Sequence, residues 1–487
     1  MGVATNTTIL KNYINGEWVE AAAAETLPVP DPATGEDMAL VPLSTAEDVR
    51  KAVASAEEAY RTWRDVPVTD RAQVLFRLKI LLDAHHEDLT RAVVRENGKT
   101  HNEAWGEVRR GIEVVEFACG APSLIQGRSL QDVSRGVDTT MLRFPIGVVG
   151  GISPFNFPAM IPLWMAPVAI VCGNTFVHKP SERTPLSANM LADLWTEAGL
   201  PKGVLNVVHG AKDAVNGLLT DPGVRAISFV GSQPVAEYVY KTAAAHGKRV
   251  QALAGAKNFV IVMPDADQDR AADLVLSSAF GNAGERCLAG STIVTVGTAA
   301  QTLVPKLIER ARAMRVGSGL DSATDMGPVI RADHSARVEN YIEIGVREGA
   351  TLALDGRDGK PEQPGNGFFL RPSIFTGVTP EMTIAREEIF GPVLSILEAE
   401  TLDEAITTAN GSRFGNAAVI CTSSGAAARQ FQMRIEAGMV GVNVGVPAPV
   451  AWFPFAGWKQ SFYGDLHATG EDSIHFYTER KVVTSRW

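Results

Sequence analysis

From residue 147 onward, short apolar segments alternate with longer segments in which apolar side chains recur every three or four residues. The short segments, bounded by turn residues, predict buried strands, and the periodic segments predict helices. The predicted strands are 147–152, 174–178, 204–208, 226–230 and 249–253, and the helices between them are 160–171, 187–198, 211–219 and 233–245. This alternation predicts an α/β architecture with a doubly wound, mostly parallel sheet.

A second region of the same kind follows from 258 to about 450. Its predicted strands are 259–263, 292–297, 393–397 and 417–421, with helices near 268–280, 300–313, 333–347 and 424–437. The chain before residue 147 predicts a hairpin at 12–18 with an Asn-Gly turn, helices at 46–63, 69–96 and 107–121, and a second hairpin at 129–143. The tail, 473–487, has the alternation of a strand.

Composition narrows the class of protein. The 487 residues are 45% hydrophobic and 21% charged, which is enough material for more than one core. The net charge of −10 is spread along the chain, unlike a nucleic-acid-binding footprint. The longest apolar run, 159–172, is too short to span a bilayer, and no signal peptide is visible, so we expect a cytoplasmic protein with no membrane partner. The histidines show no ligand pattern, and the four cysteines are too far apart for a zinc motif, so we expect neither metal nor disulfide.

Cys287 lies in a loop of small residues, 281–290, between a predicted helix and a predicted strand. Glycines allow a backbone to approach a ligand closely. The guanidinium of the preceding residue, Arg286, is expected to lower the pKa of the thiol and favour the nucleophilic thiolate. Most free cysteines, however, are small buried hydrophobic residues. The segment by itself leaves both interpretations open.

Two other strand ends carry polar residues suited to a nucleotide, although no G-x-G-x-x-G motif is present. The predicted strand at 226–230 ends in Gly231-Ser232 at a helix start, where free backbone amides suit a pyrophosphate. Lys179 and Glu182 follow the strand at 174–178. They are placed either to hold ribose hydroxyls or to form an ordinary surface charge pair.

Five motifs taken together resemble the aldehyde dehydrogenase superfamily over essentially the whole chain. They are SPFNFP at 153–158, KPSE at 179–182, FVGS at 229–232, GERC at 284–287 and EEIFGPV at 387–393. The resemblance implies an aldehyde dehydrogenase-like α/β fold, with a Rossmann-type NAD domain, an α/β catalytic domain and a small β oligomerisation domain. It places these domains at 1–126 with 146–253, at 254–455, and at 127–145 with 456–487, and implies a homodimer or homotetramer.

The resemblance also implies roles for individual residues. Cys287 is expected to be the nucleophile, and the side chain of Asn156 to share an oxyanion hole with the Cys287 backbone amide. The residues expected to contact NAD are Ser153, Phe155, Lys179, Glu182, Arg183, Ser232, Ala254, Glu388 and Phe390. A carboxylate at Glu182 would bind a ribose 2′-hydroxyl and repel a 2′-phosphate, which favours NAD over NADP.

One position departs from the superfamily pattern. Members that release a free acid carry Glu-Leu-Gly-Gly-Lys after the last strand of the cofactor domain, and this glutamate activates water. Here the segment reads LAGAK at 253–257, and Leu253 cannot accept a proton. Either the enzyme is inactive or slow, or its acyl group passes to a stronger nucleophile such as the thiolate of coenzyme A.

The segments GAKN at 255–258, FACGAP at 117–122 and GWKQSFYGD at 457–465 resemble the methylmalonate-semialdehyde dehydrogenases, the CoA-acylating branch. The resemblance implies NAD-dependent oxidative decarboxylation of methylmalonate or malonate semialdehyde to propionyl-CoA or acetyl-CoA through a Cys287 thioester. Two alternatives remain: a hydrolytic NAD-dependent aldehyde dehydrogenase that yields a free acid, and a non-catalytic protein that keeps the fold.

The substrate of that branch carries a carboxylate, for which arginine is the most suitable partner. Arg286 is the first candidate because it adjoins the nucleophile, and Arg110, in the predicted helix 107–121, is the second because of the family match. The alternative for Arg110 is an ion pair with Glu107 or Glu113 on the surface of its own helix.

Overall fold

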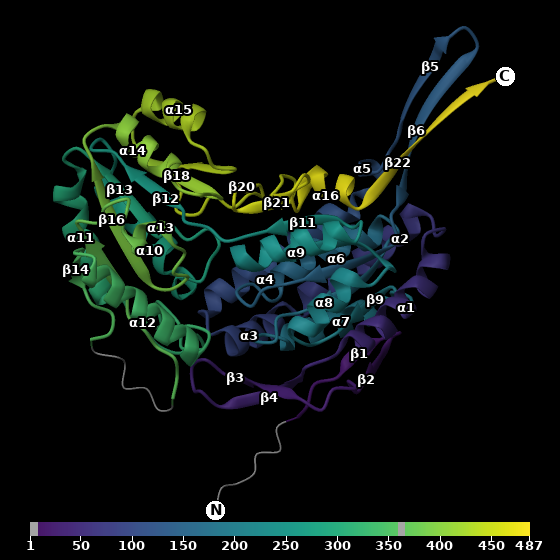
Figure 1. Ribbon diagram of the computed structural model, residues 1–487, viewed down its shortest axis with the longest axis horizontal. Helices are drawn as coiled ribbons and strands as arrows, with labels where there is room; N and C mark the ends of the chain where they lie inside the picture. The colour runs from purple at the N-terminus through teal and green to yellow at the C-terminus, as the bar shows by residue number, and fades with distance from the viewer. Residues whose placement is uncertain (1–7, 359–365) are drawn as a thin grey trace, which may run out of the picture.

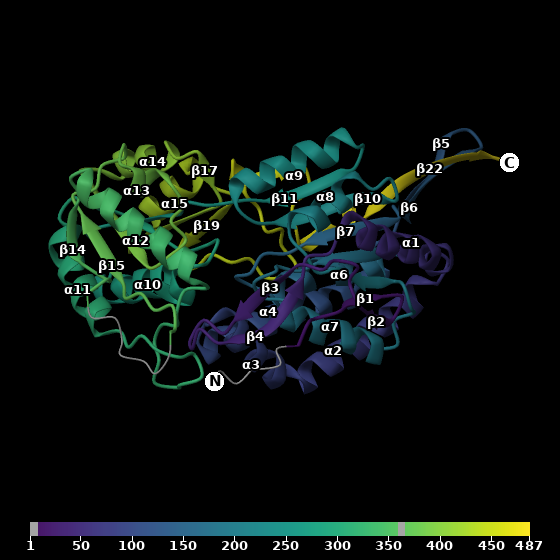
Figure 2. The ribbon, with the colours of Figure 1, turned by 60° about the horizontal axis from the view of Figure 1, so that its bottom comes forward.

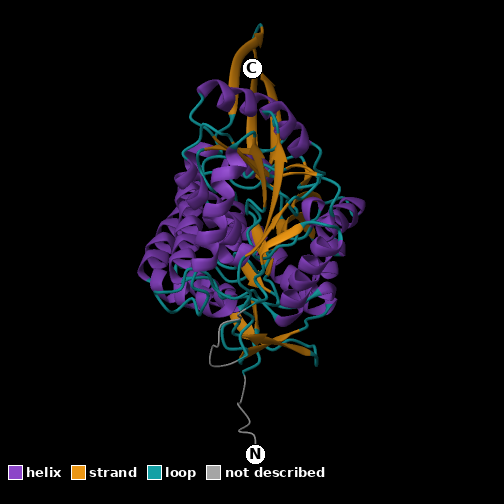
Figure 3. Cartoon of the chain, turned by 90° about the vertical axis from the view of Figure 1, so that its left-hand side faces the viewer, coloured by secondary structure: helices purple, strands orange, loops and turns teal. Residues whose placement is uncertain are grey.

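The structure is a computed structural model that describes residues 8–358 and 366–487. Residues 1–7, at the start of the predicted 1–126 segment, and residues 359–365, inside the predicted 254–455 domain, lie outside the described residues. Two α/β lobes lie side by side, and a narrow β-sheet projects from one of them (Figure 1). Seen from the end of the molecule, strands run up the middle with helices on both sides (Figure 3).

The first lobe is built on an eight-stranded sheet in the order β2-β1-β9-β8-β7-β10-β11-β21. Its strands are β1 Asn12–Ile14, β2 Glu17–Val19, β7 Val148–Ile152, β8 Thr175–Lys179, β9 Leu205–Val207, β10 Val224–Val230, β11 Arg249–Leu253 and β21 Phe462–Gly464. The five strands from β9 to β11 are parallel, and the antiparallel β1 and β21 flank them. Strand β7 is buried throughout, because helices cover both faces of the sheet.

Nine helices accompany this sheet among the described residues. They are α1 Ala46–Trp63, α2 Val68–Ala84, α3 His86–Asn97, α4 His101–Cys119, α5 Ala121–Leu124, α6 Met160–Val171, α7 Leu186–Glu197, α8 Lys212–Thr220 and α9 Gln233–Ala245. Every residue of α6 is buried, as expected of a helix that is apolar all round. It packs against α4 in the largest apolar core of the molecule.

The second lobe has a seven-stranded sheet in the order β14-β15-β16-β13-β12-β18-β19, with its own core. Its strands are β12 Phe259–Val262, β13 Thr292–Val296, β14 Thr351–Leu354, β15 Ser373–Thr376, β16 Val393–Ala399, β18 Ala417–Cys421 and β19 Met439–Val442. All but β14 are parallel. Its helices are α10 Gln268–Phe280, α11 Ala299–Ala313, α12 Ala332–Arg347, α13 Thr383–Arg386, α14 Leu402–Asn410 and α15 Gly425–Arg434.

The projecting sheet has three antiparallel strands, β5 Arg128–Ser134, β6 Val137–Pro145 and β22 Thr478–Arg486. Strand β22 pairs with the whole of β6, from Thr478 opposite Pro145 to Arg486 opposite Val137. Figures 1 and 2 show this sheet extending away from both lobes. Two further pairs complete the fold: β3 Thr26–Pro30 with β4 Asp37–Pro42, and β17 Phe414–Gly415 with β20 Trp458–Lys459.

Three predictions of local structure need correction. The helix predicted at 69–96 is two helices, α2 and α3, which meet at His85. The helix predicted from 107 begins at His101, because the Thr100 side chain accepts a hydrogen bond from the Glu103 amide and caps it. The tail predicted as a strand opens with a helix, α16 Gly470–Phe476, before β22. In the described part of the chain, no helix combines the length and hydrophobicity needed to cross a bilayer.

Candidate active site

The loop that carries Cys287 joins α10 to β13 between the two lobes' cores. It opens with a short 3-10 turn, Gly281–Gly284, in which Asn282 and Ala283 have φ of 52° and 50°. Residues other than glycine rarely adopt this left-handed backbone conformation, and such strained residues concentrate at functional sites. At Gly284 a Cβ atom would lie 2.2 Å from the Gly391 carbonyl oxygen, so the close approach of the EEIFGPV segment to this turn requires glycine. Cys287 itself remains partly accessible.

Two asparagines hold the main chain of Cys287. The Nδ2 atoms of Asn258 and Asn416 each donate a hydrogen bond of 2.9 Å to the Cys287 carbonyl oxygen. Asn258 also donates to the Ala289 carbonyl oxygen and accepts from the Ala417 amide. Sequence reasoning assigned no role to this pair. The signal is positional: each asparagine immediately precedes a strand, β12 or β18, of the sheet that contains β13.

Asn156 is fixed on both its side chain and its main chain. Its Nδ2 donates to the Glu285 carbonyl oxygen at 2.9 Å, which leaves the second hydrogen of that nitrogen for another acceptor. Its own carbonyl oxygen accepts from Lys99 Nζ at 2.7 Å. Lys99 forms a fully buried ion pair, 2.5 Å long, with Glu107. The second Glu107 oxygen accepts the two amides at the start of α6, Ala159 and Met160.

The surroundings of Cys287 favour the neutral thiol over the thiolate. Burial raises its pKa to about 12, and the negative charge of Glu388 adds to this rise, while Arg286 opposes it only weakly. Arg286 thus lowers the pKa of the thiol, as expected, but burial and Glu388 raise it by more. The guanidinium of Arg286 is engaged elsewhere: it donates to Glu103 at 2.8 Å and to the Ser277 carbonyl oxygen at 3.2 Å.

Arg110, the second residue expected to bind the substrate carboxylate, has a partly exposed side chain. It forms a 3.0 Å ion pair with Glu113, its side chain is 35% exposed, and it donates to the Ala448 carbonyl oxygen at 3.3 Å. The surface pair considered as the alternative is thus present, with Glu113 and not Glu107. The contact with Ala448 places Arg110 against a loop that packs on the same core as Cys287.

Several residues expected to hold the cofactor form connected groups. Lys179 and Glu182 are 3.1 Å apart at the end of β8. Burial acts to raise the pKa of Glu182, but the charge of Lys179, the hydrogen bonds to the carboxylate and the charge of Arg183 together hold that pKa below its usual value. Phe155 stacks edge-on against Phe390 at 5.8 Å, and the Arg183 guanidinium lies 5.3 Å from the Phe155 ring centre.

Glu388 and its surroundings link the two lobes. Its Oε1 accepts the Ala256 amide at 2.8 Å, and burial raises its pKa to about 7. A Cβ at Gly255 would come within 2.6 Å of the other carboxylate oxygen, so the chain after β11 passes directly against Glu388. The Ala254 amide is taken by the Ser461 carbonyl oxygen.

The remaining expected cofactor residues lie at strand ends of the first sheet. The Ser153 hydroxyl bonds to His178 Nε2 at 2.8 Å. Ser232 is exposed at the N-terminus of α9, with no side-chain cap. The free amides there, together with the Lys179–Glu182 pair at the neighbouring edge, fit a dinucleotide with its pyrophosphate at α9 and a ribose at Glu182.

Leu253 ends β11 and is 4% exposed, paired in register with Val230 and Phe462. It packs in the core that Cys287 borders, and this apolar side chain stands where the resemblance would place the glutamate of hydrolytic aldehyde dehydrogenases. Among the residues that the structure describes, no group of three histidine, cysteine or acidic side chains is arranged to hold a metal ion.

Comparison with known proteins places this geometry in a family. The model of the aldehyde dehydrogenase family matches residues 18–483. The chain belongs to the aldehyde dehydrogenase family. It has the aldehyde dehydrogenase fold, as the motifs predicted.

Malonate-semialdehyde dehydrogenase 2 of Geobacillus kaustophilus is 59% identical over 485 residues and covers all of both chains. Malonate-semialdehyde dehydrogenase of Halalkalibacterium halodurans is 58% identical, over 98% of each chain. The crystal structure of methylmalonate-semialdehyde dehydrogenase from Oceanimonas doudoroffii has a TM-score of 0.97 at 49% identity, over 99% of each chain. An NAD+ complex of aldehyde dehydrogenase from Bacillus cereus has a TM-score of 0.93 at 33% identity, over 98% of this chain and 96% of that one.

Proposed function

We propose that the enzyme catalyses NAD-dependent, CoA-acylating oxidative decarboxylation of malonate or methylmalonate semialdehyde to acetyl-CoA or propionyl-CoA. The observation that carries the proposal is the buried Leu253 at the position of the hydrolytic base. Relatives named malonate- and methylmalonate-semialdehyde dehydrogenases, similar over the full length, support the substrate class.

The chemistry begins at Cys287. Because the high pKa of Cys287 favours the neutral thiol, its proton must pass to solvent before or during attack on the aldehyde carbon. The attack creates an oxyanion, for which the free hydrogen of Asn156 Nδ2 and the Cys287 amide are the proposed donors. A bound NAD would supply the hydride acceptor for this adduct. Cys287 then carries the acyl group as a thioester.

Decarboxylation needs no further site. In the thioester the substrate carboxylate is β to the carbonyl carbon, so loss of CO2 leaves an enolate on the thioester oxygen. The same Asn156 donor would stabilise that charge. The enolate takes up a proton on carbon from solvent, which gives the acetyl or propionyl thioester. The thiolate of CoA then attacks the thioester carbon, the bond to Cys287 Sγ breaks, and Cys287 leaves as a thiolate that is reprotonated.

The NAD site is proposed to use both lobes. Lys179, Glu182 and the nearby Arg183 would bind the adenosine ribose, and the N-terminus of α9 at Ser232 the pyrophosphate. The ionised Glu388 would accept hydrogen bonds from the hydroxyls of the nicotinamide ribose. The other proposed contacts are Ser153, Phe155, Ala254 and Phe390.

Arg110 and Arg286 are proposed to bind the substrate carboxylate. Arg110 is the more exposed of the two, with 35% of its side chain accessible against 19% for Arg286, and it must exchange Glu113 for the substrate. Arg286 must first exchange Glu103 for the substrate. Arg110→Leu and Arg286→Leu should each raise KM sharply for malonate semialdehyde and much less for propanal, which has no carboxylate. Equal effects on the two aldehydes would contradict the assignment.

A homodimer or homotetramer is proposed, with the projecting sheet as its contact. Strand β5 is exposed throughout, and Leu130, Leu142, Val482 and Val483 are among the exposed apolar residues of this sheet. An open edge with apolar side chains is protected when another chain pairs with it. The domain limits 1–126 with 146–253, 254–455, and 127–145 with 456–487 remain a proposal, with β21 of the last segment contributing to the first sheet.

The decisive experiment follows NADH formation from malonate semialdehyde with and without coenzyme A, with identification of the acyl product. Repeated turnover only with CoA, giving acetyl-CoA, is expected, with a single NADH burst in its absence. Steady turnover without CoA, giving a free acid, would favour the hydrolytic alternative and require another group to activate water.

A further inference from the structure

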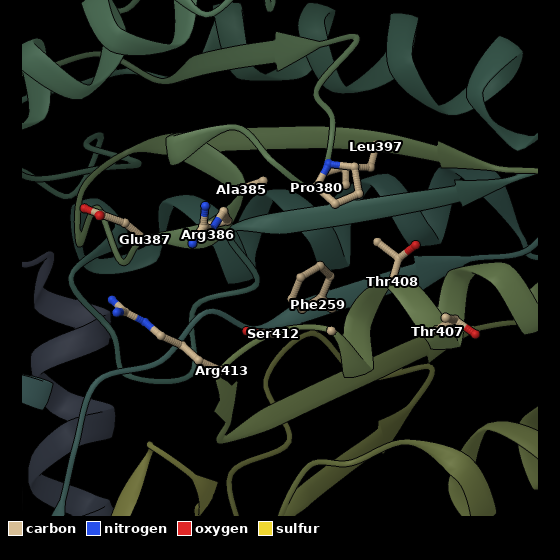
Figure 4. A pocket seen from close by; sticks show the side chains of 11 residues that line it. Phe259, Pro380, Ala385, Arg386, Glu387, Leu397, Thr407, Thr408, Ser412 and Arg413 are labelled. Atoms are coloured by element: carbon tan, nitrogen blue, oxygen red, sulfur yellow. The ribbon is translucent and has the colours of Figure 1, made fainter.

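A cavity of about 340 Å³ opens in the second lobe, beside the start of β12 and between α13 and α14. The residues that line it are Phe259, Pro380, Ala385, Arg386, Glu387, Leu397, Thr407, Thr408, Gly411, Ser412 and Arg413. Figure 4 shows Arg386, Glu387 and Arg413 at one end of it and the two threonines at the other. This volume lies at the lower end of the range of small-molecule sites. It suits a head group and not a whole dinucleotide.

The two arginines give the cavity its chemistry. Within residues 8–358 and 366–487, neither Arg386 nor Arg413 forms an ion pair with a carboxylate, in contrast to Arg310 and Arg357 of the same lobe. Arg413 lies over the ring of Phe414, 4.8 Å from its centre. Arg386 and Arg413 are both exposed residues that line the cavity, and a guanidinium without a carboxylate partner is a suitable ligand for phosphate.

One lining residue has the opposite charge. The carboxylate of Glu387 accepts a 2.7 Å hydrogen bond from the Tyr341 hydroxyl. With two arginines against one glutamate, the wall remains net positive. Hydroxyls of Thr408 and Ser412 add polar groups to the same wall. The cavity therefore favours an anion with several oxygens.

The position of the cavity connects it with the nucleophile. Its lining residue Phe259 directly follows Asn258, and Arg413 precedes Asn416 by three residues. Both asparagines bond to the Cys287 carbonyl oxygen. Three residues span at most about 11 Å, so the cavity lies close behind the Cys287 loop. The expected pyrophosphate and adenosine-ribose ligands, in contrast, lie on the first sheet at β8 and α9.

We propose that this Arg386–Arg413 cavity binds the phosphate-bearing nucleotide end of coenzyme A, which the proposed function requires as cosubstrate. The phosphates meet the two guanidiniums, and the flexible pantetheine arm runs from the cavity to the thioester. The site is separate from that for NAD, so both nucleotides have a place on one subunit. The thiol of CoA then displaces Cys287 as described above, with no other reactant.

The test compares wild type with Arg386→Gln, Arg413→Gln and the double variant. Arg429→Gln is the matched control, since Arg429 is exposed on α15, outside the cavity. The double variant should raise KM for CoA at least about tenfold. The rate and amplitude of the NADH burst without CoA, and KM for pantetheine as acyl acceptor, should stay as in wild type and the control. An unchanged KM for CoA would overturn the cavity assignment and leave the proposed function intact.

A binding measurement separates the two hypotheses. Calorimetry with adenosine 3′,5′-bisphosphate on the enzyme saturated with NAD should show binding to wild type and to Arg429→Gln, and at least about tenfold weaker binding to the double variant. This holds even if turnover proves independent of CoA, which would refute the proposed function alone. Absence of binding to wild type, or equal competition by inorganic phosphate, would overturn the nucleotide site.

Discussion

The pKa of Cys287 leads to a quantitative prediction about the free enzyme. Only the thiolate reacts with iodoacetamide at a useful rate. With a pKa of about 12, about one thiol in ten thousand is ionised at pH 8, against about a quarter for an unperturbed cysteine. Alkylation of Cys287 should therefore be about two thousandfold slower than that of a free thiol, and should rise about tenfold per pH unit from pH 7 to 10.

Two variants test the causes of this pKa in opposite directions. Glu388→Gln removes the negative charge that raises the pKa, so alkylation at pH 8 should be faster. Arg286→Leu removes the charge that lowers it, so alkylation should be slower. Peptide mass spectrometry can follow the alkylation of Cys287 separately from that of the other cysteines. Cys119, Cys172 and Cys421 are buried, and their peptides serve as internal references. A plateau in rate below pH 9, or a change of the same sign in both variants, would refute the reasoning.

Three further predictions concern the supports of the site. Lys99→Met should lower the free energy of unfolding by about 3–5 kcal/mol, because it leaves the Glu107 charge buried and uncompensated. The double variant Lys99→Met/Glu107→Leu should recover part of that stability, as measured by urea unfolding at equal protein concentration. Losses that simply add would argue against a stabilising pair. Asn416→Ala leaves one donor on the Cys287 carbonyl, and should slow the NADH burst while KM for NAD is unchanged; a shift in KM alone would mean a different role. KM for NAD should fall as pH rises from 6 to 8, because Glu388, with its pKa of about 7, becomes ionised and a better acceptor for ribose hydroxyls. Glu388→Gln should abolish this pH dependence.

The alternating part of the fold was accessible from the sequence because its strands are buried on both faces. Such strands give unbroken apolar runs, as in Val148–Ile152. The pattern failed where periodicity continues across a break: α2 and α3 share one apolar repeat, and only the backbone at His85 separates them. It also missed β3, whose Pro28 and Pro30 weaken a strand prediction, although a two-stranded pair tolerates them.

In the candidate site, too, the sequence predicted some features and missed others. Motifs single out Cys287 and Asn156, but not the hydrogen bonds that orient them. Cys287, Asn258 and Asn416 are far apart in the chain. They meet because each lies in the segment that enters one of three adjacent parallel strands, β13, β12 and β18. Strand order is a property of the folded sheet, so this contact could not be predicted from local pattern. The same holds for the pairing of Arg286 with Glu103 on α4.

The closing segments of the chain bear on how it folds during synthesis. Strand β21 completes the first sheet beside β11, and β22 covers β6. Until residues 462–486 leave the ribosome, both of these earlier strands present an unpaired edge, and open edges invite pairing with other chains. Most of the polypeptide must therefore be made before either edge is covered. A nascent chain stalled short of β21 would expose both edges, and we expect it to be the species most prone to pair with other chains.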